Sequence, residues 1–420
     1  MKKILFVTLG HLSAGEFTIA FEFCKRLPPN KFEICFLTSA KGQNYLEQNR
    51  IKHVVLKQTG ANSMSEDKLV NKAITDRLMS EFRPDYVIAS DVYTLWYSST
   101  WSGVNMETFR EYGVPFGSFD SYEFDSTNYV QDYYGGYRAT LPDYIRQCDF
   151  VIRYCPINKL QPADKKVKFT YFYDRPEGMT KPERLEFESA FRPSGQEKVI
   201  FMANSDWENL NVNRLPALSN LLCWCPKMIM HYLAELDEKV TIIHVGPRSW
   251  EQESGNKKHI KYFHFNHINP QDFDKYLGAS DLFLTTNIIS STLAKAVYAS
   301  VPSIVLQNDK LVNFSRISEQ LLKMPDWYQE MANDVKVAYP YRLFPFGWFN
   351  FLSSVLENNE YVDTFISTSI FQKGKTLNAL RTYISDKDSR ISLQHKQNMY
   401  INKILQLPSS ADVIDSLENL

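Results

Sequence analysis

Three residues whose side chains can exchange protons, His11, Asp91 and Asp120, each follow an apolar run of strand length. Because parallel strands end at one edge of their sheet, we expect these side chains at that edge, where such folds place ligands. A histidine titrates near neutral pH and suits a general base, which needs an orienting partner. We therefore predict His11 as the base, with Asp120 or Asp91 as its partner. Asp120 is preferred because the polar, aromatic loop 121–125 that follows it suggests a pocket wall.

Structural roles are open for the same three residues. His11 could cap a helix or hydrogen-bond within its own loop. Asp91 and Asp120 could each be the N-cap of a following helix, because aspartate is among the residues preferred there. The sequence leaves both interpretations standing.

A second polar group lies where a loop enters a helix, and it suits an anion. The loop 286–291 follows the apolar run 281–285 and precedes apolar residues at helical spacing. Free N–H groups and the helix dipole favour a phosphate at such a start. Ser290, Ser291 and Thr292 add hydroxyl donors, so we predict a diphosphate clamp here. Helix capping alone is the alternative.

Two further loops of the second half of the chain carry candidates for the same ligand. Ser205 follows the apolar run 198–203, and Gly246 and Arg248 follow the run 240–245. An arginine can form two parallel hydrogen bonds with a phosphate, although Arg248 could also be an ordinary surface residue.

Strand and helix patterns alternate along the chain in two series. We expect strands at 3–8, 32–37, 52–56, 85–89, 115–119 and 150–155, and again at 198–203, 240–245, 260–265, 281–285 and 303–306. Amphipathic helices separate most of them. This order predicts an α/β protein with two doubly wound, Rossmann-like parallel sheets.

The length of 420 residues exceeds what one core usually holds, so two domains are expected. Prolines and charges break the rhythm at 156–196. We place an N-terminal domain at 1–160, a linker at 161–196, a C-terminal domain at 197–400 and a tail at 401–420. The region from Lys310 onward is expected to be mostly helical.

Composition excludes several classes of protein. The net charge of −1 argues against a nucleic-acid partner. No run approaches the roughly 20 apolar residues of a membrane span, and no signal-peptide cleavage site follows the N-terminal run. The six cysteines lie mostly on apolar runs, which indicates buried thiols and a cytoplasmic location. Without an Asp-x-Asp element or a second pair to join Cys223 and Cys225, we expect no metal.

The layout resembles the GT-B fold of glycosyltransferases, in which two such domains face each other across a cleft. Three segments carry the resemblance: the loop from Gly10 to Gly15 with Glu16, the turn Gly246-Pro247, and the stretch 279–305. In that family the histidine of the first loop faces the acceptor, and the last segment binds the donor. The resemblance therefore implies that the loop holding Gly10, His11 and Gly15 lies on the acceptor side.

The chain departs from the family pattern in the donor segment. An acidic residue that holds the donor ribose is replaced by Lys295, and a glycine is replaced by Ser300. An ammonium group only donates hydrogen bonds, so it cannot take over the role of a carboxylate. Gln307, Asn308 or Asp309 could hold the ribose instead. Otherwise Lys295 meets a phosphate, is an exposed helix residue, or marks the loss of nucleotide binding.

The sequence thus predicts a glycosyltransferase that is inverting and metal-independent and uses a nucleotide sugar as donor, with no separate cofactor. The acceptor would be a hydroxyl or amine. The aromatic residues between Trp96 and Tyr144 favour an aromatic natural product or a peptide. Two alternatives are a nucleotide-sugar epimerase of the same fold and a non-catalytic, partner-binding member of it.

Overall fold

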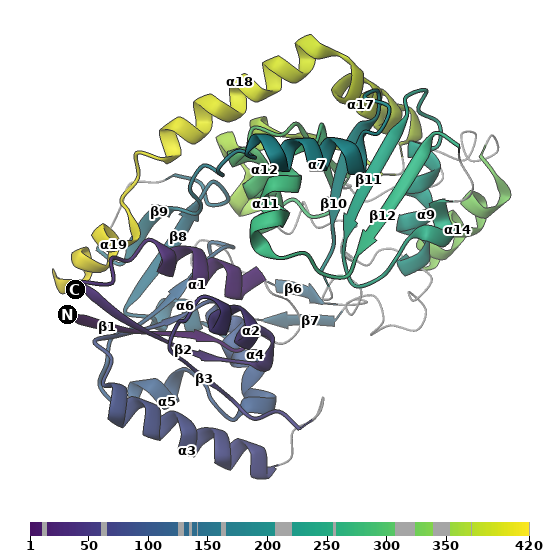
Figure 1. The fold of residues 1–420 in the computed structure, drawn as a ribbon. Coiled ribbons are helices and arrows are strands. Elements are labelled where there is room, and N and C mark those ends of the chain that lie inside the picture. Colours follow the sequence, from purple (N-terminus) through teal and green to yellow (C-terminus); the bar gives the residue numbers. More distant parts are fainter. Residues whose placement is uncertain are drawn as a thin grey trace. The chain divides into compact units, whose positions relative to one another are not determined.

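The computed structural model describes residues 1–419, except 11–14, 60–64, 125–129, 134–136, 141, 161–164, 206–220, 255–257, 307–323, 339–352 and 371. The chain divides into two compact units (Figure 1). The first comprises Met1–Asn128, Pro142–Tyr173 and Ile404–Leu420, and the second comprises Tyr129–Leu141 and Asp174–Lys403.

The described part of the first unit is built on a parallel sheet with the strand order β3-β2-β1-β4-β5-β8-β9. In that order the strands are His53–Val55, Phe32–Thr38, Lys2–Thr8, Tyr86–Ala89, Phe116–Phe119, Phe150–Cys155 and Val167–Tyr171. The helices are α1 (Gly15–Lys25), α2 (Ala40–Gln48), α3 (Ser65–Phe82), α4 (Val92–Ser102), α5 (Met106–Arg110), α6 (Tyr144–Gln147), α19 (Ser410–Ser416) and the 3₁₀ helix η4 (Leu417–Asn419).

Helices cover both faces of this sheet, which is why its central strands are buried runs rather than alternating ones. On one face, Leu5 and Val7 of β1 join a core with residues of α3, α4 and α5. On the other, the ring of Phe6 lies 6.1 Å from that of Phe23 in α1. Figure 1 shows α1 on one side of the strands and α3 and α5 on the opposite side.

The described part of the second unit has a parallel sheet in the order β12-β11-β10-β13-β14-β15 and a separate hairpin. The sheet strands in that order are Ile260–Phe265, Val240–Val245, Lys198–Ala203, Leu282–Thr285, Ser303–Leu306 and Ile366–Thr368, and the hairpin pairs β6 (Val130–Tyr133) with β7 (Tyr137–Thr140). The helices are α7 (Lys181–Phe191), α9 (Leu221–Leu233), α10 (Glu251–Ser254), α11 (Pro270–Ala279), α12 (Ser291–Tyr298), α14 (Asp326–Ala338), α16 (Ser353–Leu356), η3 (Glu360–Thr364), α17 (Lys373–Ser385) and α18 (Lys387–Ile404).

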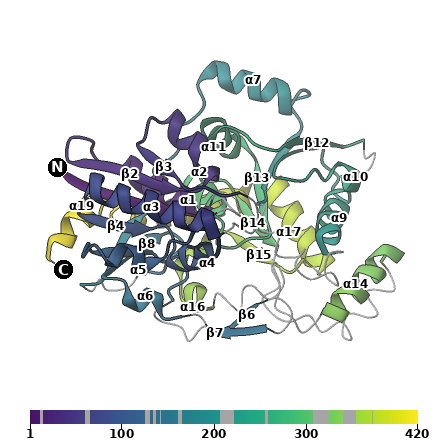
Figure 2. The same ribbon diagram turned by 90° about the horizontal axis from the view of Figure 1, so that it is seen from below.

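This second sheet is also covered on both faces. Ile200 and Met202 of β10 share a core with α9, α14 and α17. Phe201 points the other way, and its ring lies 5.0 Å from that of Phe273 in α11. Figure 2 shows α9, α14 and α17 on one side of these strands and α11 on the other. The prediction of two doubly wound α/β sheets is confirmed.

The two units are bounded differently from the predicted domains. Within the expected linker 161–196, β9 completes the first sheet by pairing with β8, whereas α7 belongs to the second unit. The expected tail 401–420 packs mostly in the first unit. Lys2 Nζ contacts Asp415 Oδ1 at 2.9 Å, and Arg26 Nε donates to Ser410 Oγ at 3.2 Å. Strand pairing and these long-range contacts, which local composition does not reveal, set the boundaries.

Candidate functional site

The carboxyl ends of β1, β4 and β5 bring the predicted acceptor-side residues to one edge of the first sheet. Strand β4 pairs with β1 on one side and β5 on the other. Gly10, Asp91 and Asp120, which follow these strands, therefore occupy neighbouring positions. We call this group, together with Glu16 and Ser90, the first-unit edge. His11 lies outside the described residues.

Asp91 is the N-cap of α4. Its Oδ1 accepts the N–H groups of Tyr93 and Thr94 at 2.8 and 3.3 Å. The side chain is half-buried, and burial raises the pKa of its carboxyl group, although these N–H donors act in the opposite direction. The capping role weighed from the sequence is thus present in the structure.

Asp120 is fully enclosed and tied to a buried arginine. Its Oδ2 accepts hydrogen bonds from Nε and Nη2 of Arg153, both at 3.3 Å. Its Oδ1 accepts the N–H groups of Tyr122 and Phe124 at 3.3 and 3.2 Å. Both members of the pair are 2% exposed or less, so the carboxylate neutralises a buried guanidinium and shapes the loop after β5.

Glu16, in the first turn of α1, is a candidate that we did not predict. Its Oε2 accepts a hydrogen bond from Ser90 Oγ at 3.1 Å. Burial raises the pKa of Glu16 to about 8, and the negative charge of Asp91 contributes to the increase. Gly15 begins the same helix, and the carbonyl oxygen of Gly10 accepts a hydrogen bond from Ser39 Oγ at 2.9 Å.

Aromatic side chains surround the start of α4. The ring of Tyr93 lies 4.2 Å from that of Phe124, and the ring of Trp96 lies 6.3 Å from that of Tyr144. Trp96 and its neighbour Tyr97 are 39% and 41% exposed. Tyr93, Trp96 and Tyr97 follow the carboxyl end of β4, and Phe124 belongs to the loop 121–125 after β5, for which the sequence predicted a pocket wall.

The carboxyl ends of β10, β11 and β13 form the corresponding edge of the second sheet. Strand β10 pairs with β11 on one side and β13 on the other, so the loops after these three strands are neighbours. We call the following group the second-unit edge: the loop residues Asn204, Ser205, Gly246, Arg248 and Ser290 to Thr292, together with His244 near the end of β11. Gln307 and Asn308 lie outside the described residues.

Each described donor-side candidate has a definite environment. The hydroxyl oxygen of Ser205 is buried and has no hydrogen-bond partner among the described residues. The carbonyl oxygen of Gly246 lies 2.8 Å from Nε2 of His264, and its N–H donates to the carbonyl of Phe265 at 3.0 Å. Arg248 Nη2 contacts Glu253 Oε1 at 3.1 Å, so the charge of Arg248 is partly compensated.

Ser290 is the N-cap of α12, as the alternative interpretation required. Its Oγ accepts the N–H groups of Thr292 and Leu293 at 3.0 and 3.1 Å. Two of the helix N–H groups considered for a diphosphate are therefore already bonded. Ser290, Ser291 and Thr292 are each half-buried, and the hydroxyl hydrogen of Ser290 is left for another acceptor.

A buried, neutral histidine stands beside these loops and was also missed. His244 Nε2 lies 2.9 Å from Asn204 Oδ1, which can only accept, so Nε2 carries the hydrogen. Its Nδ1 then accepts from the hydroxyl of Tyr262 at 2.5 Å, and that hydroxyl accepts the N–H of Trp250 at 2.8 Å. Burial lowers the pKa of His244 to about 3, and His264 contributes in the same direction.

Lys295 is buried and ion-paired, so it could contact a ligand only by breaking that ion pair. It is 8% exposed, and its Nζ donates to Asp274 Oδ1 of α11 at 3.1 Å. The ammonium group that replaces the acidic residue of the family pattern thus forms an ion pair between two helices. Of the alternatives considered for Lys295, the exposed helix residue is wrong.

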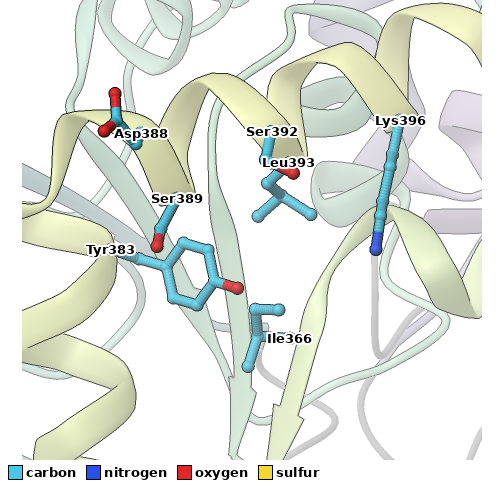
Figure 3. Close-up of a pocket in the computed structure, with 7 residues that line it drawn as sticks. All are labelled: Ile366, Tyr383, Asp388, Ser389, Ser392, Leu393 and Lys396. Carbon is cyan, nitrogen blue, oxygen red and sulfur yellow. The ribbon is translucent and has the colours of Figure 1, made fainter.

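A cavity of about 290 Å³ lies elsewhere in the second unit. It is lined by Ile366 of β15, Tyr383 of α17, and Asp388, Ser389, Ser392, Leu393 and Lys396 of α18 (Figure 3). Ile366 is the first residue of its strand, whereas the donor candidates follow the carboxyl ends of theirs. None of the predicted site residues lines this cavity.

Residues 23–418 match the model of a family of unknown function, DUF6365. The chain belongs to this family. No curated protein sequence matches the chain.

Several solved structures resemble this DUF6365 protein over its full length. HepE (Alr3699) of Anabaena, in complex with UDP and glucose, is 12% identical with a TM-score of 0.58, and 100% of each chain is covered. MurG of Acinetobacter baumannii is 12% identical with a TM-score of 0.52 at the same coverage. The glycosyltransferase VinC, in complex with dTDP, is 11% identical with a TM-score of 0.55, covering 99% of this chain and 98% of that chain.

At these identities the likeness establishes the fold. The protein has the two-domain α/β GT-B fold, as the sequence predicted. In the described part of the chain, no helix is long and apolar enough to cross a membrane. The described residues also contain no group of three or more His, Cys, Asp or Glu side chains placed to hold a metal ion. Metal independence stays a prediction.

Proposed function

We propose that this protein is a glycosyltransferase that moves a sugar from a nucleotide-sugar donor to an acceptor hydroxyl or amine. The observation that carries the proposal is the gathering of polar side chains at the carboxyl edges of both sheets of a GT-B fold. Ligands of doubly wound sheets bind at such edges. UDP with glucose in HepE and dTDP in VinC support a nucleotide sugar as the donor class.

In this proposal the second-unit edge holds the donor. The hydroxyl of Ser205, which has no partner among the described residues, and the hydroxyl of Ser290 supply donors for the diphosphate, and Arg248 supplies positive charge. A Cβ at Gly246 would lie 3.2 Å from His244 Nε2, so glycine lets this loop pack closely against His244. Gln307 and Asn308 are the candidates for the ribose hydroxyls.

The first-unit edge would serve the acceptor. His11 takes the proton of the acceptor hydroxyl while its oxygen attacks the anomeric carbon, and the bond to the diphosphate breaks with its electron pair on the diphosphate. One displacement of this kind inverts the anomeric centre. Asp91 is now the preferred partner of His11, because the charge of Asp120 is already opposed by Arg153. The rings near Trp96 favour an apolar or aromatic acceptor.

The test is a thermal-shift series with UDP-, dTDP- and GDP-sugars and the free nucleotides, without added divalent cation. A ligand that binds only the folded state stabilises it by about 2.7 kcal/mol at a concentration of 100 Kd. We expect one nucleotide family to raise the melting temperature and the Arg248→Ala variant to respond less. Sugar transfer by the responding donor is then assayed with hydroxyl and amine acceptors. No shift with any nucleotide at millimolar concentration would overturn the proposal.

A non-catalytic, partner-binding role is the second candidate, and one contact favours it. Lys295, which is ion-paired with Asp274, stands at the position where the GT-B glycosyltransferase pattern has its ribose-binding acid. Absence of nucleotide binding, combined with stable co-purification of another protein, would favour this role. Nucleotide binding followed by epimer formation without acceptor would instead indicate an epimerase.

A further inference from the structure

The cavity between β15, α17 and α18 lies apart from the second-unit edge and is large enough for a small organic molecule. Its volume of about 290 Å³ is near the lower end of the size range of small-molecule sites. Ile366 stands at the start of β15, whereas the donor candidates follow the ends of β10, β11 and β13. A ligand in this cavity would therefore bind away from the proposed donor site.

One wall of the cavity is a single face of α18. Its lining residues recur at helical spacing, which places them on one side of the helix. They are Asp388, Ser392 and Lys396, with Ser389 and Leu393 beside them. Neighbouring residues of the helix hold this wall in place. Arg390 Nη2 donates to Asp281 Oδ1 at 3.1 Å, and Gln397 Nε2 donates to the carbonyl oxygens of Val301 and Thr364, both at 2.9 Å. The cavity is thus preformed.

The lining combines an apolar surface with hydrogen-bond donors on two sides. Leu393 is buried and Ile366 is half-buried. Figure 3 shows the ring of Tyr383 on one side of these two side chains and Lys396 on the other. Neither the half-buried hydroxyl of Tyr383 nor the exposed ammonium of Lys396 has a hydrogen-bond or ion-pair partner among the described residues. Both groups are therefore available to a ligand, and a tyrosine hydroxyl that leaves water usually has a partner.

The charges around the cavity select the class of ligand. Lys396 supplies a positive charge, whereas Arg390 is already paired with Asp281. Burial raises the pKa of Tyr383, so its hydroxyl keeps its hydrogen and can donate it. Asp388 lies roughly 12 Å from Lys396 along the axis of α18 and disfavours a second negative charge at that end. A molecule with one anionic group and an apolar body fits this arrangement.

We propose that this cavity is an accessory binding site for a small monocarboxylic acid with an apolar or aromatic body. The carboxylate accepts hydrogen bonds from the ammonium of Lys396 and the hydroxyl of Tyr383. The body packs against Leu393 and Ile366. This inference goes beyond the proposed function and does not depend on it, because no lining residue belongs to either sheet edge.

The experiment titrates the full-length protein with hydrocinnamate and follows the methyl signals of isoleucine and leucine by NMR. The variant Ile366→Val identifies the signal of Ile366. We expect the signals of Ile366 and Leu393 to shift and to saturate. Hydrocinnamyl alcohol has the same body without the charge and should bind about tenfold more weakly. No shift of either signal at millimolar hydrocinnamate, or equal affinity for the alcohol, would overturn the proposal.

Two variants test the donors, and a third is their matched control. Lys396→Met should weaken hydrocinnamate binding by about tenfold, and Tyr383→Phe by about threefold. Lys387→Met removes another exposed lysine of α18, which does not line the cavity, and should leave the affinity unchanged. An equal loss in Lys387→Met and Lys396→Met would indicate unspecific attraction to the helix and contradict the inference.

Two further titrations test the ligand class and the separation from the donor site. The para-carboxy derivative of hydrocinnamate should bind more weakly than hydrocinnamate, and Asp388→Asn should reduce this difference. Equal binding of both acids to the wild type would refute the selection for a single charge. UDP and dTDP should not displace hydrocinnamate, and displacement would refute an accessory site. Hydrocinnamate binding in a protein that binds no nucleotide would overturn the proposed function alone.

Discussion

The two sheet edges differ in how their charges are balanced. At the first-unit edge, burial and the negative charge of Asp91 both raise the pKa of Glu16. At the second-unit edge, Arg248 is opposed by Glu253, and the buried His244 is neutral. In helix α12, which follows this edge, Lys295 is opposed by Asp274. The first edge is thus suited to moving a proton, and the second to binding a ligand through neutral donors and compensated charges. The proposed sugar transfer would use one edge for each of these two tasks.

The largest effect that would test this division is expected at His11. His11→Ala should reduce transfer by about 10²–10⁴-fold, because it removes the proposed base. Nucleotide affinity, measured by calorimetry, should stay unchanged because the donor groups belong to the other edge. Unimpaired turnover would remove His11 from the mechanism. Loss of nucleotide affinity together with activity would break the division itself.

The two aspartates of the first-unit edge should respond differently to the same change. Asp120→Asn should lower the free energy of unfolding by about 3 kcal/mol, because it leaves the buried Arg153 without its carboxylate. The carboxyl group of Glu123 also interacts electrostatically with Arg153, which limits the loss of stability. Asp91→Asn should cost less than about 1 kcal/mol, because asparagine is also a good N-cap. Urea denaturation measures both, and equal losses would contradict these assignments.

His244 of the second-unit edge should make stability depend on pH in the opposite direction to Glu16 of the first-unit edge. Folding lowers the pKa of His244 to about 3, so the unfolded state binds more protons below the usual histidine pKa. Stability should fall as the pH drops from about 6.5 toward 3, by up to about 3 kcal/mol at pH 4. His244→Gln should reduce this loss of stability in acid, as measured by urea unfolding at about pH 6.5 and about pH 4. The Glu16 contribution runs the opposite way, being lost as the pH rises.

The sequence predicted best those elements that depend on the local pattern of apolar and polar residues. Strands β10, β11 and β12 match their predicted limits. β10 and β11 are buried apolar runs, whereas β12 is a partly buried strand at the edge of its sheet. Helix α4 was not predicted, since its threonine, tyrosine and tryptophan residues favour strands and only the Asp91 cap signals a helix start. Packing in the folded protein decides such segments, and here Val92, Leu95 and Trp101 join the core of the first unit.

The missed site residues depend on contacts between distant parts of the chain. An acid in the first turn of a helix, such as Glu16, ordinarily interacts with the helix dipole at the surface. Its partner Ser90 is brought close only by the pairing of β1 with β4. His244 resembles any apolar-strand histidine until β10 places Asn204 beside it. A glutamate directly after a strand–glycine loop was the one available signal.

The smallest expected effect concerns Lys295, and it decides whether the second-unit edge still needs that position. Lys295→Met should lower the free energy of unfolding by about 1–3 kcal/mol, because Asp274 loses a charged partner in a half-buried place. The matched control Lys275→Met breaks the more exposed ion pair between Lys275 of α11 and Glu183 of α7, and it should cost less than Lys295→Met. Nucleotide affinity should be equal in the wild type and both variants, since the Lys295 ammonium is held by Asp274. A selective fall in affinity for Lys295→Met would show instead that this lysine leaves its ion pair for a phosphate, and the second-unit edge would then carry an active charge of its own.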